Sequence, residues 1–174
     1  MFSIRTATAA DAEALAELGV RTFRETFAKD NTPEDMALYL AKHFGGGLQR
    51  AELEDPVVCF LLLLADGEPH GYVKLRRGPA NGRGRSPLEV CRFYVDREWH
   101  GKGAALELMA SIDALARRDG HDEVWLAVWE HNARAIRFYE KHGFTQVGEQ
   151  PFTLGRDVQT DWLMSRSVTP AQSR

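Results

Sequence analysis

The most regular hydrophobic pattern lies in the second half of the chain. Six apolar residues recur there at i, i+3, i+4, i+7, i+10 and i+11, the spacing of one helix face: Ala105, Leu108, Met109, Ile112, Leu115 and Ala116. This stripe predicts an amphipathic helix that Gly120 ends. Apolar runs on either side predict strands at residues 88–95 and 124–129.

End signals predict the other helices. The first begins after Thr8, which stands three residues before Asp11 as in a capping box, and its apolar face comprises Leu15, Leu18 and Phe23. The second has Thr32 as its cap and Pro33 at its first position, carries the apolar residues Met36, Leu40 and Phe44, and is expected to end at 45–47. A third, short helix is expected at 132–142, ended by Gly143.

Shorter apolar runs predict the remaining strands and loops. Strands are expected at residues 2–6, 57–65, 71–76, 144–147 and 161–166. A turn at Asp66-Gly67 joins the second and third of these as a hairpin, which argues against a purely parallel sheet. The segments 78–87 and 151–161 are expected to be loops.

The composition is that of one ordinary globular domain. Of the 174 residues 44% are hydrophobic and 27% are charged, which excludes a disordered or collagen-like chain. We expect a single α/β domain at 1–168 and a frayed tail at 169–174.

Charge and cysteine usage narrow the environment and the partners. The net charge of −3 gives no indication of a basic surface that would bind nucleic acid. The longest apolar run, at 57–65, is half of what a membrane span needs, and the N-terminus lacks the apolar stretch of a signal peptide. Cys59 and Cys91 lie in apolar runs, as reduced core thiols do. We therefore expect a cytoplasmic monomer or homodimer that binds neither nucleic acid nor membrane.

A glycine-rich turn precedes the amphipathic helix: His100-Gly101-Lys102-Gly103-Ala104-Ala105. Backbone N–H groups in such a turn, together with the helix N-terminus, form an anion site. A Rossmann fingerprint would need a small residue in place of Leu106, and the P-loop pattern is absent. The alternative is a plain connection between a strand and a helix.

The segment that contains this turn resembles the central motif of the GCN5-related N-acetyltransferases. Leu88-Glu-Val-Cys-Arg-Phe-Tyr-Val95 precedes the turn, in which Gly103 and Ala105 match the family pattern and His100 replaces its usual Gln or Arg. The resemblance implies that the amides of residues 100–105 hold the pyrophosphate of acetyl-CoA. It also implies that Phe93, Tyr94 and Val95 lie along the pantetheine arm, with the backbone of Phe93 and Val95 pairing with its amides.

A second family motif follows at 124–144, and two of its residues are seven positions apart. Asn132 and Tyr139 therefore share one helix face, about 10 Å apart along the axis. A tyrosine hydroxyl there can protonate a leaving thiolate, although a core role is the commoner fate of such a residue. From its position alone, Asn132 is predicted to be a helix N-cap. The family resemblance implies in addition that Asn132 contacts the pantetheine arm.

Together the two motifs imply the fold and the reaction. The resemblance is to a single acetyltransferase domain with a mixed, mainly antiparallel sheet whose central strands splay at the acetyl-CoA site. The implied reaction is direct attack of an amine on the thioester. The similarity extends to bacterial spermidine/spermine acetyltransferases of the protease-synthase-and-sporulation-regulator type, which makes a polyamine one candidate acceptor.

Glu89 is the candidate general base, because an alkylammonium must lose a proton before it attacks. Strict alternation would place Glu89 on one strand face with Cys91, Phe93 and Val95. A carboxylate in an ion pair at the strand edge is an equally good interpretation of Glu89.

Several alternatives remain open from the residues alone. Cys91 has no fixed activating partner, so a buried thiol is favoured over a nucleophile. The six histidines show no metal-ligand spacing, so we expect no metal. The acceptor side is expected to come from the first two helices and the 151–161 loop, where Arg156 brings a cation that argues against a polyamine. The alternative acceptor is another amine, such as an amino sugar, an amino acid or a protein N-terminus. A non-catalytic acyl-CoA sensor is a further alternative.

Overall fold

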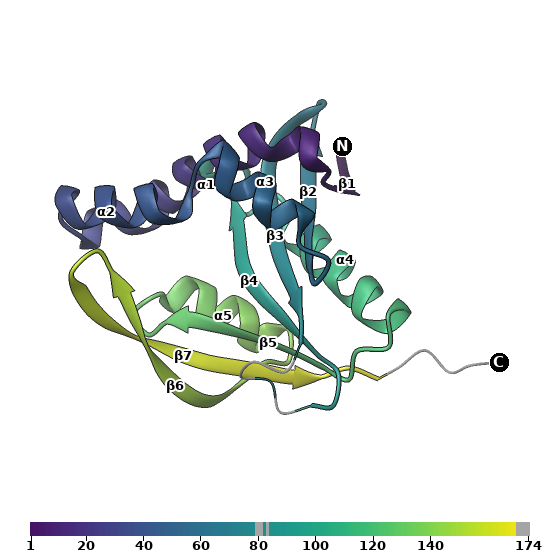
Figure 1. Ribbon diagram of the computed structural model, residues 1–174. Coiled ribbons are helices and arrows are strands. Elements are labelled where there is room, and N and C mark those ends of the chain that lie inside the picture. The colour runs from purple at the N-terminus through teal and green to yellow at the C-terminus, as the bar shows by residue number, and fades with distance from the viewer. Residues whose placement is uncertain (79–81, 83, 170–174) are drawn as a thin grey trace.

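The computed structural model describes residues 1–78, 82 and 84–169, so parts of the predicted 78–87 loop and of the tail at 169–174 lie outside the described residues. Seven strands form one sheet in the order β1-β2-β3-β4-β5-β7-β6 (Figure 1). Among the described strands β4 and β5 are the one parallel pair, and the other neighbours are antiparallel. The predicted α/β class with a mixed, mainly antiparallel sheet is confirmed.

The N-terminal helices cover one face of the sheet. Strand β1 (Phe2–Thr6) leads through a 3-10 turn, η1 (Ala9–Asp11), into α1 (Ala12–Phe27), and a second such turn, η2 (Ala28–Asp30), leads to α2 (Pro33–His43). The side chain of Thr32 accepts the Asp35 amide, as the capping signal predicts.

A third helix, α3 (Gly46–Glu54), was not expected, because the glycines at 45–47 indicate a helix end. Helix α2 does end at His43, but the chain starts a new helix at once. The buried Gln49 side chain holds this start: its Oε1 accepts the Gly45 amide and its Nε2 donates to the His43 carbonyl.

Strands β2 (Val58–Ala65), β3 (Glu68–Arg77) and β4 (Pro87–Val95) form an antiparallel meander. Leu75 pairs with Val90 and Lys74 with Arg92, so Cys91 is an extra, unpaired residue in a β-bulge. Leu88 and Val90 before the bulge, and Phe93 and Val95 after it, contact the same core cluster. The bulge therefore shifts the alternation, and the expectation that Glu89 shares a face with Phe93 and Val95 is wrong.

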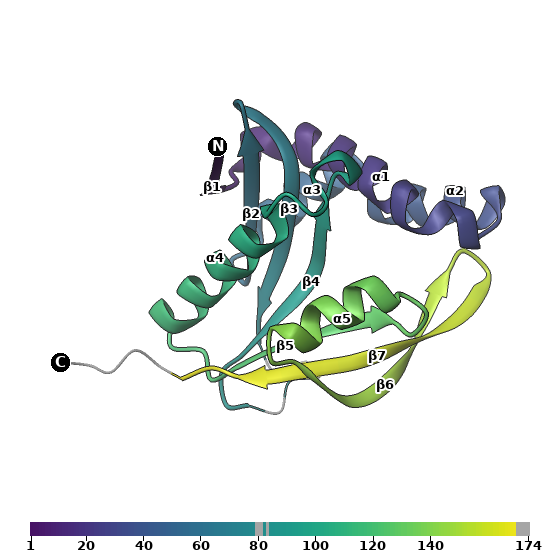
Figure 2. The same cartoon turned by 180° about the vertical axis from the view of Figure 1, so that it is seen from behind.

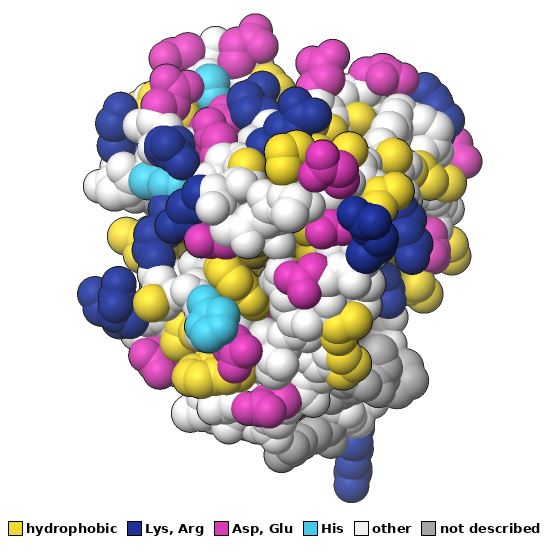
Figure 3. Space-filling view, turned by 90° about the vertical axis from the view of Figure 1, so that its left-hand side faces the viewer, with side chains coloured by type: hydrophobic (Ala, Val, Ile, Leu, Met, Phe, Trp, Pro, Cys, Tyr) yellow, Lys and Arg dark blue, Asp and Glu magenta, His cyan; other side chains and the backbone are white. Residues whose placement is uncertain are grey.

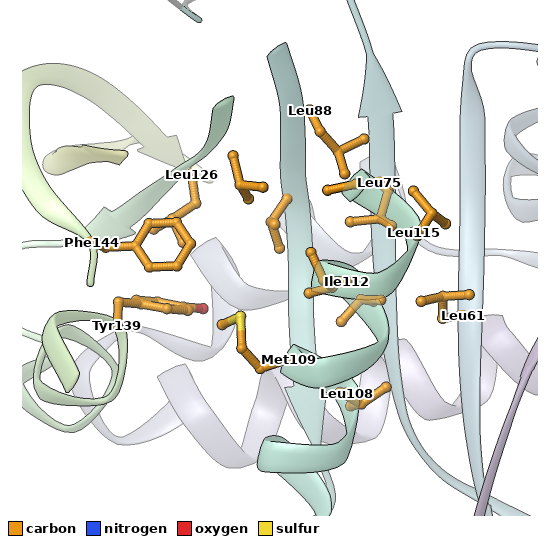
Figure 4. Packing of buried hydrophobic residues seen from close by; sticks show 14 of the residues in the cluster. Leu61, Leu75, Leu88, Leu108, Met109, Ile112, Leu115, Leu126, Tyr139 and Phe144 are labelled. Carbon is orange, nitrogen blue, oxygen red and sulfur yellow. The ribbon is translucent and has the colours of Figure 1, made fainter. Parts of the chain in front are cut away.

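The main core lies between the sheet and helices α4 (Ala104–Arg118) and α5 (Ala133–Lys141), which lie on the face opposite α1 (Figure 2). The 3-10 turn η3 (Arg97–Trp99) precedes α4, and β5 (Glu123–Trp129) lies between the two helices in sequence. The predicted stripe is buried apart from Ala105, which is half-buried. Tyr139 of α5 points toward Met109 of α4 across this core (Figure 4).

The chain closes with a long hairpin of β6 (Thr145–Leu154) and β7 (Asp157–Ser167). The expected strands at 144–147 and 161–166 are therefore too short, and the expected loop at 151–161 is wrong. Pro151 is tolerated because β6 is an edge strand of the sheet. The hairpin turn reaches α2, where Leu154 is fully buried in an aromatic cluster with Phe23 and Phe27.

Candidate active site

The sheet opens between its two central strands. Strands β4 and β5 pair only from Pro87/Glu123 to Val90/Leu126 and separate beyond that point. A cavity of about 480 Å³ occupies the resulting gap. Its walls come from β4, β5, both helix layers and the terminal hairpin, so the predicted splay of central strands is confirmed.

The glycine-rich turn forms one end of this cavity. Gly101 and Gly103 adopt positive φ angles of 75° and 90°, a conformation that favours glycine. Gly103 caps α4, and its carbonyl accepts the Glu107 amide. The preceding amides of the first turn, those of Ala104 and Ala105, have no acceptor in the described part of the chain. These amides and the helix dipole provide an anion site.

The other predicted residues of this turn differ in their availability. His100, Gly101 and Ala105 line the cavity. Lys102 does not line the cavity. Its amide donates to the Trp99 carbonyl, and its ammonium lies 5.0 Å from the centre of the Trp99 ring. Ala104 is fully buried in the core and does not line the cavity.

His100 bridges β4 and α5. Its Nε2 lies 2.7 Å from the Val95 carbonyl oxygen, and its Nδ1 is hydrogen-bonded to the Arg134 guanidinium. Arg134 can only donate, so Nδ1 accepts and Nε2–H donates to Val95, which is the neutral form of the ring. Burial, with a contribution from Arg134, lowers the pKa of His100.

Beyond Val90 the backbone of β4 has no partner strand among the described residues on the side of the gap. The Asp96 amide donates to the His70 carbonyl across the β3–β4 pair. Because the pattern alternates in an antiparallel ladder, the groups of Phe93 and Val95 point away from β3 and toward the gap. Tyr94 lies between them with its ring partly buried on the opposite face, 5.9 Å from the Tyr72 ring, and burial raises its pKa.

Asn132 and Tyr139 line the same cavity, as their spacing predicts. Asn132 caps α5 by accepting the Ala135 amide at 3.3 Å. The Tyr139 ring packs edge-on against Phe93 at 6.2 Å and Phe144 at 5.7 Å. Its hydroxyl has no hydrogen-bond partner among the described residues, and burial raises its pKa well above that of free tyrosine. The phenol therefore stays protonated at neutral pH.

Glu89 and Cys91 lie where the gap begins. Glu89 is opposite Trp125 in the last paired stretch, and its carboxylate is 3.7 Å from the Arg76 guanidinium. Burial, followed by the charge of Glu89, raises the pKa of Cys91 to about 12, as expected for a buried thiol and not for a nucleophile.

The far side of the cavity, toward α1 and α2, is aromatic. Phe23 stacks on Tyr39 at 4.4 Å, and Phe27 packs edge-on against Trp129 at 6.1 Å. Phe152 of β6 lies 5.5 Å from Tyr39. Arg92 also lines the cavity, but Glu52 accepts hydrogen bonds from both Arg92 and Lys74.

Sequence reasoning placed the 151–161 segment on the acceptor side but gave no individual role to the carboxylate at its end. Asp161 of β7 lines the cavity, is 7% exposed, and burial alone raises its pKa to about 6. The cation at Arg156 lies elsewhere: its backbone N–H and its Nε both donate to Asp35, and the residue does not line the cavity. The Arg156 cation is therefore not part of the cavity lining.

The outer face shows no dominant charge where the hairpin turn meets α2. Acidic and basic side chains are interspersed over it (Figure 3). Within the described residues no helix has the length and apolar character to cross a membrane.

Known proteins resemble this chain in sequence and in fold. A family model described as the acetyltransferase (GNAT) family matches residues 13–144. An uncharacterized N-acetyltransferase of Lactobacillus delbrueckii subsp. lactis is 37% identical over 84% of this chain and 86% of its own length. A spermine/spermidine N(1)-acetyltransferase of Bacillus subtilis is 36% identical over 41% of this chain and 47% of its own. The crystal structure of the PaiA N-acetyltransferase of Thermoplasma acidophilum with coenzyme A has a TM-score of 0.81 at 20% identity, covering 96% and 99% of the two chains.

Proposed function

Because the chain belongs to the acetyltransferase (GNAT) family, we propose that it transfers the acetyl group of acetyl-CoA to a primary amine of a small molecule. The observation that supports this most strongly is the juxtaposition of two features in one cavity. Free amides open α4 at one end, and the β4 backbone at Phe93 and Val95 faces the gap beside them. A pyrophosphate fits the first feature, and an arm with two amides fits the second by strand addition.

The residues of the gap then divide into a donor side and an acceptor side. Residues 100–105, Asn132 and Tyr139 would hold acetyl-CoA on the α4–α5 side. The amine would approach from the aromatic side, at Tyr39 and Trp129. Its attack on the thioester forms the C–N bond directly, with no acyl-enzyme, since the described residues offer no activated nucleophile: Cys91 is held as a thiol.

Tyr139 would protonate the leaving thiolate. Its phenol is protonated at neutral pH, lines the cavity and is not engaged by another side chain in the described residues. A thiolate whose parent pKa is about 8.5 is a poor leaving group at neutral pH unless it receives a proton. Two carboxylates of the cavity, Glu89 and Asp161, are candidates for the opposite task of taking the amine's proton.

A polyamine is one candidate acceptor. The similarity to the spermine/spermidine N(1)-acetyltransferase supports it over less than half of either chain. Arg156, the cation that argued against it, pairs with Asp35 and does not line the cavity. An amino sugar, an amino acid or a protein N-terminus is the alternative class of acceptor, and a non-catalytic acyl-CoA sensor is the alternative function.

Thiol release from acetyl-CoA separates these functions. The assay would compare spermidine, putrescine, an amino sugar, an amino acid and an N-terminal peptide with a blank that contains no amine. We expect thiol release that depends on the amine, with one thiol released for each amine acetylated. Mass spectrometry would identify the acetylated amine. Binding of acetyl-CoA without release for any amine would overturn the proposed enzyme and favour the sensor.

A further inference from the structure

Asp161 is a buried carboxylate with no hydrogen-bond or ion-pair partner among the described residues. Its Oδ1 has no hydrogen-bond partner, and no side chain in the described part of the chain forms an ion pair with it. A carboxylate removed from water without a counter-charge is costly, so such a group is retained where it gains a partner from outside the protein.

The surroundings of Asp161 fit a cation. Asp161 pairs with Trp129 across β5 and β7, and the Glu130 amide bonds to the Thr160 carbonyl next to them. Alternation makes Trp129/Asp161 a pair without hydrogen bonds, in which the two side chains lie close together on one face. Trp129 packs on Phe27, and the charge of Asp161 contributes to raising the pKa of Tyr39 of α2, so the two side chains interact electrostatically. An ammonium beside this carboxylate would therefore also meet aromatic faces.

Glu89 is less free to play the same part. Its Oε2 also has no hydrogen-bond partner among the described residues, but Arg76 stands 3.7 Å from its carboxylate and it lies in the stretch where β4 still pairs with β5. Asp161 lies at the level of Trp129, beyond Val90/Leu126, where the gap is open. The other titratable groups lining the cavity are Tyr39 from α2, Cys91, Arg92 and Tyr94 from β4, and His100, Arg134 and Tyr139 on the donor side.

We propose that Asp161, and not Glu89, binds the ammonium group of the acceptor and takes its proton, an inference that rests on the proposed function. One ammonium proton passes to the Asp161 carboxylate, and the neutral nitrogen attacks the thioester carbonyl carbon to form the C–N bond. As the C–S bond breaks, the sulfur leaves with the bonding pair and takes a proton from Tyr139. The nitrogen's second surplus proton restores the phenol, and Asp161 releases its proton to solvent.

The burial of Asp161 supports this task. A base works best when its pKa lies near the operating pH, and burial moves the pKa of Asp161 to about 6. Once protonated, a carboxyl group in this position costs less than the buried charge, which favours the transfer.

The test uses the full chain and a graded set of amines. Asp161→Asn, Glu89→Gln and Asp157→Asn would be compared, the last being an exposed aspartate on the same strand that does not line the cavity. The acceptors are the best amine of the panel, together with ethylamine and its mono-, di- and trifluoro derivatives, whose ammonium pKa falls with each fluorine. Acetyl-CoA affinity by calorimetry is the check that each variant is folded.

We expect Asp161→Asn to lower kcat/KM for ethylamine at neutral pH by about 10²-fold or more, the usual contribution of a general base. The loss should shrink as the pH rises and nearly vanish for trifluoroethylamine, which is already neutral. Asp157→Asn should stay within a few-fold of wild type, and Glu89→Gln should lose less activity than Asp161→Asn. An equal loss for all four ethylamines, or a larger effect of Glu89→Gln, would overturn the assignment. A wild type that acetylates no amine overturns the proposed function instead.

Discussion

The Nε2 atom of His100 lies 2.7 Å from the carbonyl oxygen of Val95, the last residue of β4. This hydrogen bond ties the strand expected to bind pantetheine to the turn expected to bind pyrophosphate. Arg134 of α5 donates to the other nitrogen of the same ring, so His100 connects three elements only while it is neutral. The Gln or Arg usual in the family motif has no such dependence near neutral pH.

Acidification should therefore lower the free energy of unfolding of the wild type through protonation of His100. Its pKa is lowered by burial, so the protonated ring fits the folded chain less well than the unfolded chain. Its contribution to stability is present above the ordinary histidine pKa of about 6.5 and is lost as the pH falls below that value. In His100→Gln, which keeps a donor for Val95, the free energy of unfolding should fall less between pH 7.5 and 5.5. Urea unfolding at both values measures this, and equal decreases would contradict it.

Tyr139→Phe should lower kcat by about 10²–10³-fold, because it removes the hydroxyl and keeps the ring packed against Phe93 and Phe144. Acetyl-CoA affinity should change little. Tyr72→Phe is the matched control, since Tyr72 is a buried tyrosine outside the cavity and should retain full activity. If Tyr139→Phe turns over like the control while chemistry limits the rate, Tyr139 has only a core role.

Arg156→Ala should leave the choice between acceptors unchanged. The guanidinium is paired with Asp35 at the hairpin turn and does not line the cavity. We expect the ratio of kcat/KM for spermidine to that for a monoamine to stay within about twofold of wild type. A tenfold rise, worth about 1.4 kcal/mol, would mean that Arg156 repels cationic acceptors after all.

The sequence predicts best those elements whose signals are local. The stripe from Ala105 to Ala116 and the cap at Thr32 act within one helix, and both are found as expected. Helix α3 depends on Gln49, which bonds to the chain on both sides of the glycines, and no local pattern indicates that arrangement.

Two features of the site depend on packing between distant segments. The bulge at Cys91 turns Glu89 away from the face of Phe93, and strand alternation alone gives no sign of it. Asp161 becomes buried only because β7 pairs with β5 and the hairpin packs against the aromatic residues of α1 and α2. The glycine-rich turn at 100–105, in contrast, lies within one continuous segment, so its place at the start of α4 could be predicted.

The central claim is that acetyl-CoA lies against the amides that open α4. Two substitutions to glutamate in the first turn of α4 test this claim. Ala105 lines the cavity, whereas its neighbour Leu106 is 57% exposed and does not. The helix dipole stabilises a carboxylate in the first turn, so Ala105→Glu and Leu106→Glu should both stay folded.

Calorimetric titration of acetyl-CoA into these two variants and the wild type is the most direct measurement. We expect Ala105→Glu to weaken binding by about 10²-fold, because its carboxylate would face the pyrophosphate at close range. Leu106→Glu should bind as tightly as the wild type. Undiminished affinity in a folded Ala105→Glu variant, or equal losses in both variants, would contradict the placement of acetyl-CoA in this gap.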